Sequence, residues 1–291
     1  MATTIAQSFV ELRRNLEITG LQKTTVSTRQ TNVREALEAD LSIVDSFLTG
    51  SYSRNTMIAP LKEADVDIFV QLDGRYFYQY NKGGQAGLLE LVKRTLKKTY
   101  TRTPDISRNG QAISIRFEDF VVDVVPGFSR SGGGYLIPNS VTKTWLSTDP
   151  KKHVEIMSSQ NDAHNGDLVP LAKMIKGWNT TIGKYFRSFH LEALAIQILK
   201  GVTISDFPSG IRYYFDKGRA VIKDKNLDPA GYGDDLGKYI DTQEKVREAV
   251  EKFELAYERA IKAEDYARRG YVQNAVEMWR KVFGDYFPAY G

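Results

Sequence analysis

The sequence Thr49-Gly50-Ser51-Tyr52-Ser53 is followed, twelve residues after Ser53, by Asp65-Val66-Asp67 at the head of an apolar run. Side chains alternate between the two faces of a β-strand, so Asp65 and Asp67 are expected to point to the same side. Two carboxylates that converge on one point suit Mg²⁺, a hard cation that prefers oxygen ligands and shares them with substrate phosphates. The pattern therefore predicts a site for metal-dependent nucleotidyl transfer, with Mg²⁺ as cofactor and Mn²⁺ as its substitute.

The segment before the aspartates has the pattern of a phosphate-binding turn. Residues 42–49 are predicted to form a strand that stops at Gly50 and continues into a helical turn. A strand that ends in Gly-Ser and turns into a helix exposes backbone N–H groups, which commonly cradle a phosphate. We therefore expect Gly50 and Ser51 to hold the phosphates of a nucleotide.

A third carboxylate lies inside residues 121–125, Val-Val-Asp-Val-Val, within a strand predicted for residues 120–125. A lone Asp123 there would be strongly disfavoured unless a cation or a hydrogen-bond donor offset its desolvation. Three carboxylates on neighbouring strands could hold two Mg²⁺ ions, one for the attacking hydroxyl and one for the triphosphate and leaving pyrophosphate. The structural alternative is that Asp123 pairs with Arg116. Taken singly, the Gly-Ser turn, the Asp-x-Asp pair and the strand aspartate each favour a purely structural role. Their order along the chain, by contrast, favours a catalytic site.

The composition is that of an ordinary globular protein. The 291 residues are 42% hydrophobic and 26% charged, which argues against disorder and leaves room for two lobes. The absence of cysteine excludes disulfides, and a zinc site would rest on three scattered histidines. No run approaches the roughly 20 apolar residues of a membrane span, so we expect a cytoplasmic protein with no membrane contact. The net charge of +4 suits polyphosphate ligands.

Hydrophobic spacing predicts the elements of the first half of the chain. Besides the strands named above, we expect helices over residues 5–16 and around 27–37, a strand over 65–72 and a helix over 88–96. The second helix is predicted to begin with a capping box formed by Ser27 and Gln30. Asn109-Gly110 predicts a tight hairpin between strands at 106–108 and 111–117.

Residues 131–134, Ser-Gly-Gly-Gly, predict a flexible segment that lets two lobes move. Beyond it the pattern is mostly helical, with helices expected over residues 168–178, 190–199, 204–216, 242–269 and 272–283. We therefore predict an α/β protein of two domains. Residues 1–145 would hold a mixed sheet and the N-terminal helices, and residues 146–291 would form a helical lobe.

Three motifs in this order resemble a known group of enzymes. Residues 50–56 followed by Asp65-Val66-Asp67 resemble the signature of the polymerase-beta-type nucleotidyltransferases. Residues 171–179 and 187–192 are similar to the helical half of the cyclic GMP-AMP synthase and oligoadenylate synthase branch. Residues 279–288 resemble the carboxy terminus of bacterial cyclic-oligonucleotide synthases of antiphage signalling. Over nearly its whole length the chain resembles a bacterial cGAS/DncV-like nucleotidyltransferase, or CD-NTase.

This resemblance implies a polymerase-beta-like lobe, an oligoadenylate-synthase-like helical lobe and the synthesis of a cyclic di- or trinucleotide second messenger from NTPs, ATP among them. It also implies that Asp65, Asp67 and Asp123 are the catalytic, metal-binding carboxylates. The implied nucleotide contacts are Gly50, Ser51, Ser53, Lys173, Lys176, Ser188 and Phe189. In this set Lys176 and Ser188 match residues that reach the triphosphate, and Phe189 matches an aromatic residue that stacks on a base.

Ordinary interpretations of the helical residues stay open at this point. Lys173 and Lys176 lie three apart on one helix face and could simply be solvated. Phe189 could equally belong to a core. Within the polar residues 161–167, Asp167 is a credible N-cap for the next helix. Asn165 is a candidate for base selection, because asparagine can bind the edge of a base with two hydrogen bonds.

Two other functions remain as alternatives. One is a template-independent RNA nucleotidyltransferase of the CCA-adding or poly(A) type, although the chain lacks an added RNA-binding domain. The other is a catalytically silent binding or toxin-partner module whose last helices present Phe253, Tyr257, Trp279 and Tyr286 to a partner. The resemblance also implies a protein activator, or a conjugating partner that acts at Gly291. Activation by DNA is not expected, because without cysteine the zinc-bearing DNA-sensing insertion is missing.

Overall fold

The computed structural model describes residues 3–102 and 105–291. Its contacts divide the chain into two compact units. One, the sheet unit, is Ile18–Val154, and the other, the helical unit, joins the residues up to Glu17 with Glu155–Gly291. The boundary thus falls later than the predicted one at residues 145 and 146, because Thr144–Thr148 forms a strand of the sheet. Residues 1, 2, 103 and 104 of the predicted first domain lie outside the described residues.

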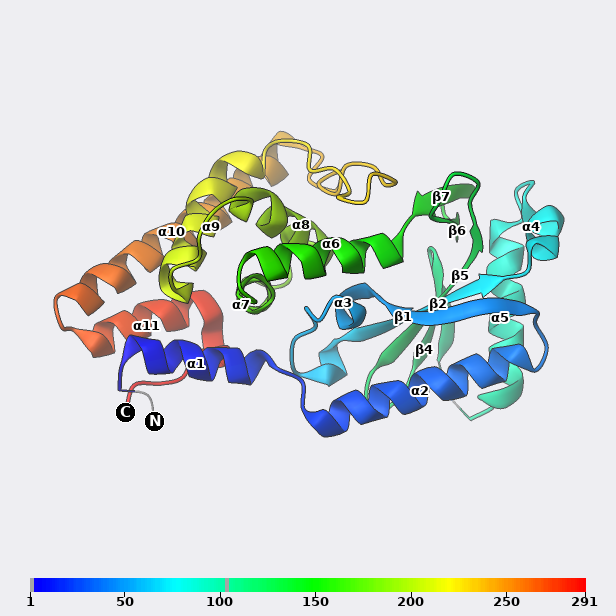
Figure 1. Cartoon of the computed structure of the whole chain (residues 1–291), viewed down its shortest axis with the longest axis horizontal. Helices are drawn as coiled ribbons and strands as arrows, with labels where there is room; N and C mark the ends of the chain where they lie inside the picture. The colour runs from blue at the N-terminus through cyan, green and yellow to red at the C-terminus, as the bar shows by residue number, and fades with distance from the viewer. Residues whose placement is uncertain (1–2, 103–104) are drawn as a thin grey trace. The chain divides into compact units, whose positions relative to one another are not determined.

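The sheet unit is built on one mixed sheet, which confirms the predicted fold class (Figure 1). The described residues form seven strands in this sheet: β1 (Ile43–Thr49), β2 (Asp65–Leu72), β3 (Ile106–Asn109), β4 (Ala112–Arg116), β5 (Val121–Ser129), β6 (Tyr135–Asn139) and β7 (Thr144–Thr148). The main order is β1-β2-β5-β4-β3, and β6 and β7 extend from β5. The central pair, β2 and β5, is parallel, and β1 and β4 flank it in antiparallel pairing.

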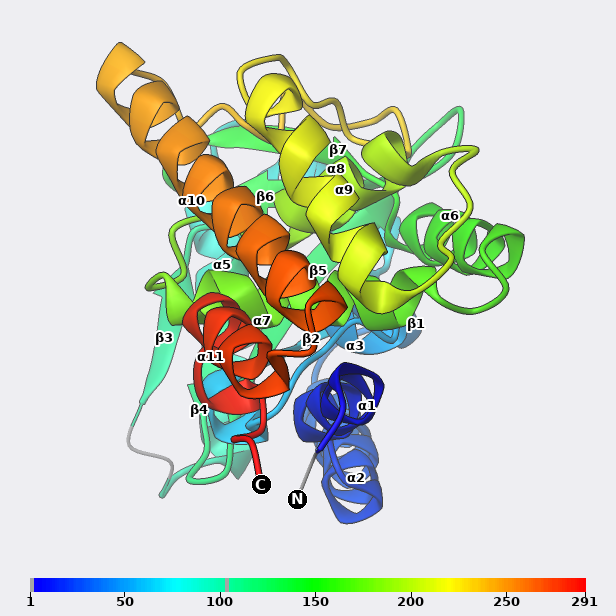
Figure 2. The same cartoon turned by 90° about the vertical axis from the view of Figure 1, so that its left-hand side faces the viewer.

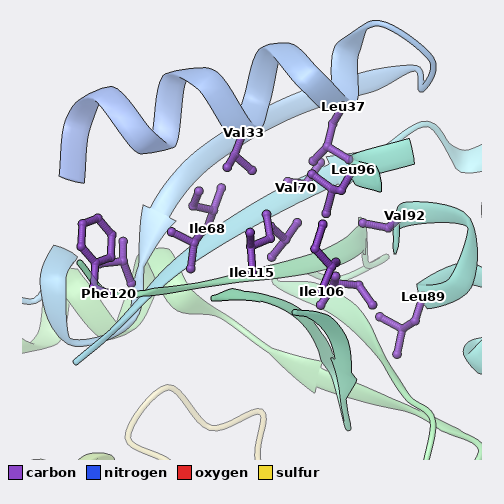
Figure 3. Close-up of a cluster of buried hydrophobic side chains, with 14 of the residues drawn as sticks. Val33, Leu37, Ile68, Val70, Leu89, Val92, Leu96, Ile106, Ile115 and Phe120 are labelled. Atoms are coloured by element: carbon purple, nitrogen blue, oxygen red, sulfur yellow. The ribbon is translucent and has the colours of Figure 1, made fainter. Parts of the chain in front are cut away.

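Two helices, α2 (Gly20–Glu38) and α5 (Gln85–Thr99), cover one face of this sheet. In Figure 3, Val33 and Leu37 of α2 lie over Ile68 and Val70 of β2. All four side chains are at most 1% exposed, and each is worth about 1.5–3 kcal/mol of hydrophobic stabilisation. Because alternate residues of β2 fill this core, the intervening ones are turned to the opposite face.

Two local predictions in the sheet unit are corrected. Helix α2 begins at Gly20 rather than near residue 27, because the capping box is formed by Thr19 and Gln22. The Thr19 N–H donates to Gln22 Oε1 at 2.8 Å, and the Gln22 N–H donates to Thr19 Oγ1 at 3.2 Å. Ser27 and Gln30, with the same spacing, lie inside the helix. Capping thus overrides the weak helix propensity of glycine at the first position.

The glycine-rich residues 131–134 form a turn inside the sheet unit rather than a link between units. They connect β5 to β6, and the Arg130 N–H donates to the Gly134 carbonyl at 3.0 Å. Gly132, Gly133 and Gly134 all have positive φ, which explains the run of glycines. In contrast, the hairpin predicted at Asn109-Gly110 is confirmed by the pairing of β3 with β4.

Besides β6, β7 and the last short turn of the chain, the elements that were not predicted are η1 (Leu61–Glu63), α4 (Gly74–Tyr80) and α6 (Pro150–Ala163). Helix α6 runs from the sheet unit into the helical unit, because the division falls between residues 154 and 155. No helix in the described ranges is both long and apolar enough to span a bilayer.

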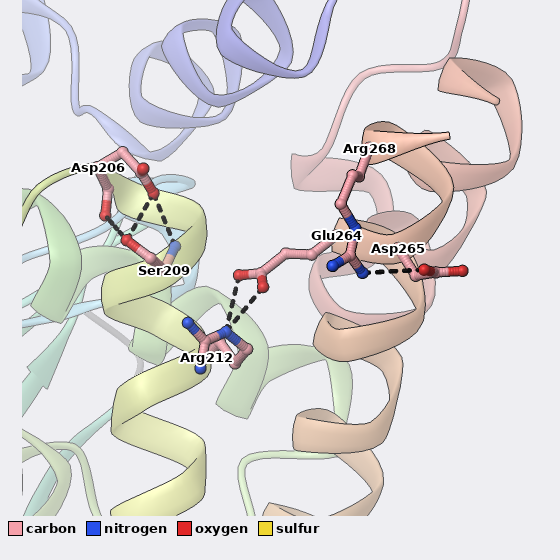
Figure 4. A network of polar contacts seen from close by, with 6 residues as sticks. All are labelled: Asp206, Ser209, Arg212, Glu264, Asp265 and Arg268. Carbon is pink, nitrogen blue, oxygen red and sulfur yellow. Dashed lines mark hydrogen bonds and ion pairs between the residues drawn. The ribbon is translucent and has the colours of Figure 1, made fainter. Parts of the chain in front are cut away.

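The helical unit contains the helices predicted for the second half of the chain. These are α7 (Leu168–Thr181), α8 (Ser188–Leu199), α9 (Phe207–Val221), α10 (Gln243–Arg268) and α11 (Val272–Phe283), followed by the short turn η2 (Gly284–Tyr286). Figure 2 shows α10 lying alongside α9. In Figure 4 the Arg212 guanidinium of α9 donates to both oxygens of Glu264 on α10, at 3.0 and 2.8 Å.

The first helix, α1 (Ile5–Leu16), belongs to this unit and not to the sheet unit as predicted. Its Phe9 ring packs edge-on against Trp279 at 5.0 Å and against Phe287 at 5.2 Å between ring centroids. Trp279 and Phe253 are fully buried, so they are core residues and do not form the partner surface considered from sequence. The apolar stripe of α1 is thus covered by aromatic residues from the other end of the sequence.

Candidate active site

The three predicted aspartates lie on one face of two adjacent strands. The parallel register places Asp67 directly beside Asp123, and Asp65 beside Val121. Strands in a sheet are about 4.8 Å apart, and Asp65 is two residues from Asp67 on the same side. This face is opposite the one filled by Val66 and Ile68, so the core of the unit orients the aspartates.

The Gly-Ser turn lies against the second aspartate. Strand β1 ends with Thr49 opposite Asp67, and Gly50 begins the one-turn helix α3 (Gly50–Ser53). Gly50 has a φ of +66°, and a Cβ atom there would lie only 1.8 Å from Asp67 Oδ2. Only glycine fits both restrictions, the left-handed backbone and the contact with the carboxylate.

The serines of this turn are half-buried, and several hydrogen bonds hold the backbone around them in place. The Ser51 carbonyl accepts the Thr56 and Met57 N–H groups at 2.9 and 3.0 Å. The Ser53 hydroxyl donates to the Gly50 carbonyl at 3.2 Å. Ser53 therefore holds the turn closed in this structure, a role that the sequence did not suggest.

The environment of Asp123 shifts the pKa of its carboxyl upward. Burial raises its pKa, a hydrogen bond from Ser114 lowers it, and the nearby charge of Asp65 raises it again. Among the described residues, nothing bonds its Oδ1 atom, which is buried. Arg116 is close enough to affect the pKa, but its ion pair is with Asp105, at 3.3 Å between Nε and Oδ2. The alternative that Asp123 is simply paired with Arg116 is therefore wrong.

These oxygen atoms fit a hard divalent cation by their chemistry. A buried, unpartnered carboxylate oxygen beside a second aspartate is a position where a cation would offset a desolvation cost. In the part of the chain that the structure describes, no three His, Asp or Glu side chains are already grouped closely enough to hold a metal ion. The Asp67 carboxylate contacts Gly50, and the Asp123 carboxylate is hydrogen-bonded to Ser114. The support for a metal site therefore comes from the backbone register of β2 and β5, and not from the side-chain positions in this structure.

In the helical unit the two predicted lysines are buried, at 3% exposure for Lys173 and 6% for Lys176. The ordinary interpretation of a solvated face is therefore wrong. Lys173 Nζ lies 2.7 Å from Glu17 Oε2, and Lys176 Nζ lies 3.4 Å from Glu192 Oε1. Both lysines come from α7, so this helix carries two positive charges into the interior of the unit.

Ser188 and Phe189 form the first turn of α8, with Ser188 exposed and Phe189 half-buried. Glu192 follows Ser188 by four residues, so both lie on the same face of α8. The ion pair of Glu192 with Lys176 therefore brings Lys176 and Ser188 to the same end of the α7–α8 pair.

Asn165 lies at the opposite end of that helix pair. The neighbouring His164 contacts the Leu199 carbonyl through Nε2 at 2.9 Å, at the last turn of α8. Helix α8 has 12 residues, so roughly 18 Å of helix separates this turn from Ser188. Asp167 occupies the N-cap position of α7 without a side-chain cap bond, and Asn161 Oδ1 instead accepts the Val169 N–H at 2.9 Å.

The sequence interpretation missed two residues next to the predicted site. Ser114 lies opposite Asp123 in the antiparallel β4–β5 pair. Counting back from the turn in which the Phe117 N–H donates to the Phe120 carbonyl would have revealed it. Glu192 belongs to the quoted motif at residues 187–192, but no role was assigned to it. The signal was the presence of one acidic residue within the otherwise apolar residues 191–195.

The mixed sheet with its aspartates and the separate helical unit define a nucleotidyltransferase of the polymerase-beta-like class. The chain belongs to the family of the Second Messenger Oligonucleotide or Dinucleotide Synthetase domain, whose family model matches residues 3–161. It is therefore a cGAS/DncV-like nucleotidyltransferase, and members of this family synthesise oligonucleotide second messengers.

Individual relatives agree with this membership. The chain is 28% identical to a cyclic AMP-AMP-AMP synthase of Acinetobacter sp., over 98% of this chain and 86% of the relative. Its fold is similar to that of E. coli MS115-1 CdnC in complex with HORMA-deltaN, with a TM-score of 0.72, 17% identity and 98% of both chains covered. It is also similar to Vibrio cholerae DncV, a cyclic AMP-GMP synthase, with a TM-score of 0.68 and 16% identity over 97% of this chain and 87% of that one.

Proposed function

We propose that this protein joins NTPs, ATP among them, into a cyclic di- or trinucleotide and releases pyrophosphate, with Asp65, Asp67 and Asp123 as the ligands of Mg²⁺ or Mn²⁺. The observation that carries the proposal is the parallel register that sets Asp67 beside Asp123. The contact of the Gly50 backbone with the Asp67 carboxylate supports it, because it joins the phosphate turn to the acidic strands.

When bound, the divalent ions would neutralise the triphosphate and lower the pKa of the attacking hydroxyl. The protein's own groups have separate tasks. The backbone of Gly50 and Ser51 holds phosphate oxygens, and Ser53 keeps that turn closed. Asp123, whose pKa burial raises and whose carboxylate Ser114 holds by a hydrogen bond, helps to deprotonate the attacking hydroxyl.

In the helical unit we assign phosphate contacts to the Lys176 ammonium and the Ser188 hydroxyl, and stacking on a base to Phe189. The shared end of the α7–α8 pair supports this grouping. Lys173, three residues before Lys176 on α7, is assigned to nucleotide binding with it, and its ammonium lies 2.7 Å from Glu17 Oε2 on α1. The assignment of the helical residues follows the resemblance of residues 171–179 and 187–192 to the family.

We place the reaction in the cytosol, where NTPs are abundant, and in antiphage signalling. A protein partner as activator is supported by the relative that was solved with HORMA-deltaN. Conjugation at Gly291 is a second way in which a partner could act.

The test is a reaction of the purified protein with four labelled NTPs and Mg²⁺ or Mn²⁺, followed by phosphatase treatment and mass spectrometry. A phosphatase-resistant cyclic product is expected. Asp65→Asn should reduce its rate by about a thousandfold, because metal stabilisation of the transition state is worth several kcal/mol. Asp162→Asn, a change at an exposed aspartate of α6, is the matched control and should leave the rate unchanged.

Other outcomes would support the alternatives. Linear extension of an RNA primer would favour an RNA nucleotidyltransferase. Failure to bind Mg²⁺-ATP in calorimetry would favour a silent binding module. Unchanged cyclic product from Asp65→Asn would overturn the assignment of the metal site.

A further inference from the structure

Residues 222–242, between α9 and α10, form an ordered segment that docks on α8. Asn226 is 3% exposed, and its Nδ2 donates to Gln197 Oε1 on α8 at 2.6 Å. Its own backbone N–H donates to Asp235 Oδ1 at 3.0 Å, and its carbonyl accepts the Leu236 N–H at 2.7 Å. The segment is drawn in yellow to orange in Figure 1. It is therefore closed on itself and bonded to the last turns of α8.

The end of the same segment contacts the first turn of α8 through one side chain, Tyr239. Its hydroxyl accepts the Arg187 N–H at 3.1 Å and lies 3.0 Å from His190 Nδ1. The Arg187 guanidinium lies over its ring, 4.7 Å from the centroid. Gly237 packs on His190, since a Cβ atom there would lie 3.2 Å from the imidazole Cε1. The bonded residues, Arg187 and His190, flank Ser188 and Phe189.

The hydrogen bonds and the burial of His190 together indicate the protonation state of its ring. The Tyr239 oxygen accepts the Arg187 N–H, and the hydroxyl hydrogen is left to donate to His190 Nδ1. In this arrangement the imidazole is neutral and carries its hydrogen on Nε2. Burial lowers the pKa of His190 to about 4, which agrees with a neutral ring at pH 7. Within the described residues Nε2 has no hydrogen-bond partner, so Nδ1 alone orients the ring by hydrogen bonding.

This arrangement replaces the usual cap of α8. Arg187 is the N-cap residue and makes no side-chain cap bond, and His190 is the third residue of the helix. In a capping box, the side chain of the third residue accepts the N-cap N–H directly. In α8 the Tyr239 hydroxyl lies between the Arg187 N–H and the His190 side chain and is hydrogen-bonded to both. The first turn of α8 is thus fixed by a residue that lies outside the helix.

We propose that Tyr239 is a positioning residue for nucleotide binding: its hydroxyl bridges Arg187 and His190 and thereby fixes the Ser188–Phe189 turn in its binding position. The inference rests on the proposed function, which assigns nucleotide contacts to Ser188 and Phe189. It makes the segment at residues 222–242 a determinant of nucleotide affinity. The bridge acts on binding and not on the reacting atoms, so the KM should change and the kcat should not.

The test is Tyr239→Phe, which keeps the ring under Arg187 and removes only the hydroxyl. We expect the KM for ATP to rise about tenfold, as two neutral hydrogen bonds are lost, while kcat stays within about twofold. Tyr213→Phe is the matched control, because Tyr213 is a partly buried tyrosine on the neighbouring α9 whose ring faces Lys217 at 5.4 Å. It should leave both constants unchanged.

Two further readouts separate positioning from general stability. Long-range ¹H–¹⁵N spectra should show one Nε2–H tautomer of His190 in the wild type and a mixture in Tyr239→Phe. Hydrogen exchange at residues 187–191 should accelerate in that variant and not in the control. His190→Asn, which keeps an acceptor close to the position of Nδ1, should retain more ATP affinity than His190→Ala.

The outcomes distinguish this inference from the proposed function. A wild type that makes product while Tyr239→Phe keeps both its KM and its exchange rates overturns the positioning role alone. A fall in kcat without a change in KM also overturns it. A wild type that binds no NTP overturns the proposed function and the positioning role together.

Discussion

Lys176 Nζ on α7 lies 3.4 Å from Glu192 Oε1 on α8, and the two side chains are only 7% and 1% exposed. Removing two charges from water is costly, and a buried pair is tolerated because each ion offsets the desolvation of the other. The pair therefore holds a lysine in the interior at the end of α8 that also carries Ser188. Apolar side chains at these two positions would fill a core with a smaller desolvation cost. The buried ammonium of Lys176 is therefore consistent with a role in binding an anion.

Glu192→Ala should destabilise the protein by about 3 kcal/mol, since it leaves the Lys176 ammonium buried without the carboxylate at 3.4 Å. Urea unfolding measures the change. The control is Asp285→Asn, which breaks an ion pair with Arg280 in which the aspartate is fully exposed, and which should leave the midpoint unchanged. Equal effects of the two substitutions would contradict the role of burial.

Gly50→Ala should abolish product formation, because the new methyl group would occupy the position of the Asp67 carboxylate. Gly110→Ala is a matched control with a similar positive φ of +58°, and beyond its chain neighbours no atom of the described residues lies within 4 Å of the added Cβ. Both variants should lose about 1–2 kcal/mol of stability from left-handed strain. Only Gly50→Ala should lose activity, measured as pyrophosphate release. An active Gly50→Ala variant would show that the Gly50–Ser51 turn is not part of the active site.

His190 predicts a pH dependence of stability. Its pKa is about 4 in the folded protein and near 6.5 when unfolded, so folding favours the neutral ring. The stabilisation is complete above about pH 6.5 and is lost as the pH falls toward about 4. The wild type should lose about 2.5 kcal/mol more than His190→Asn between about pH 7.5 and about pH 4.5. Urea titrations at several pH values check this, and parallel curves for the two proteins would refute it.

Asn165→Gly should leave base preference unchanged, because a helix length of roughly 18 Å separates this turn from Ser188. Glycine removes the side chain without strain, since Asn165 has a φ of +54°. Product composition from mixed NTPs, determined by mass spectrometry, measures the preference. A changed base composition would restore Asn165 as a base-selecting residue.

The sequence predicted the parts of the sheet site that depend on local rules. Strand alternation sets Asp65 and Asp67 on one face, and the desolvation cost at Asp123 marks a buried carboxylate. The register that pairs Asp67 with Asp123 could not be predicted, because the two strands are separated by two helices and a hairpin. Ser114 was missed for a different reason: its register follows from the short turn before β5, but no role was assigned to it.

Weak or repeated local signals account for the errors. Strand β6 contains Pro138, which argues against a strand, and the two apolar residues of β7 are adjacent rather than alternating. Thr19-Gln22 and Ser27-Gln30 have the same capping spacing, and only the folded helix distinguishes them. The burial of Lys173 and Lys176 depends on acidic partners on α1 and α8, which helical spacing on α7 alone does not reveal.

The packing of Phe9 against Trp279 and Phe287 has a consequence for biosynthesis. The sheet unit is one unbroken stretch and can fold as soon as it leaves the ribosome. Phe9 is synthesised 270 residues before Trp279, so at about 5–20 residues per second the apolar face of α1 waits roughly 15–50 seconds for the rings that cover it. During that interval the nascent chain presents a binding site for chaperones, and slower translation of residues 155–287 would lengthen its exposure.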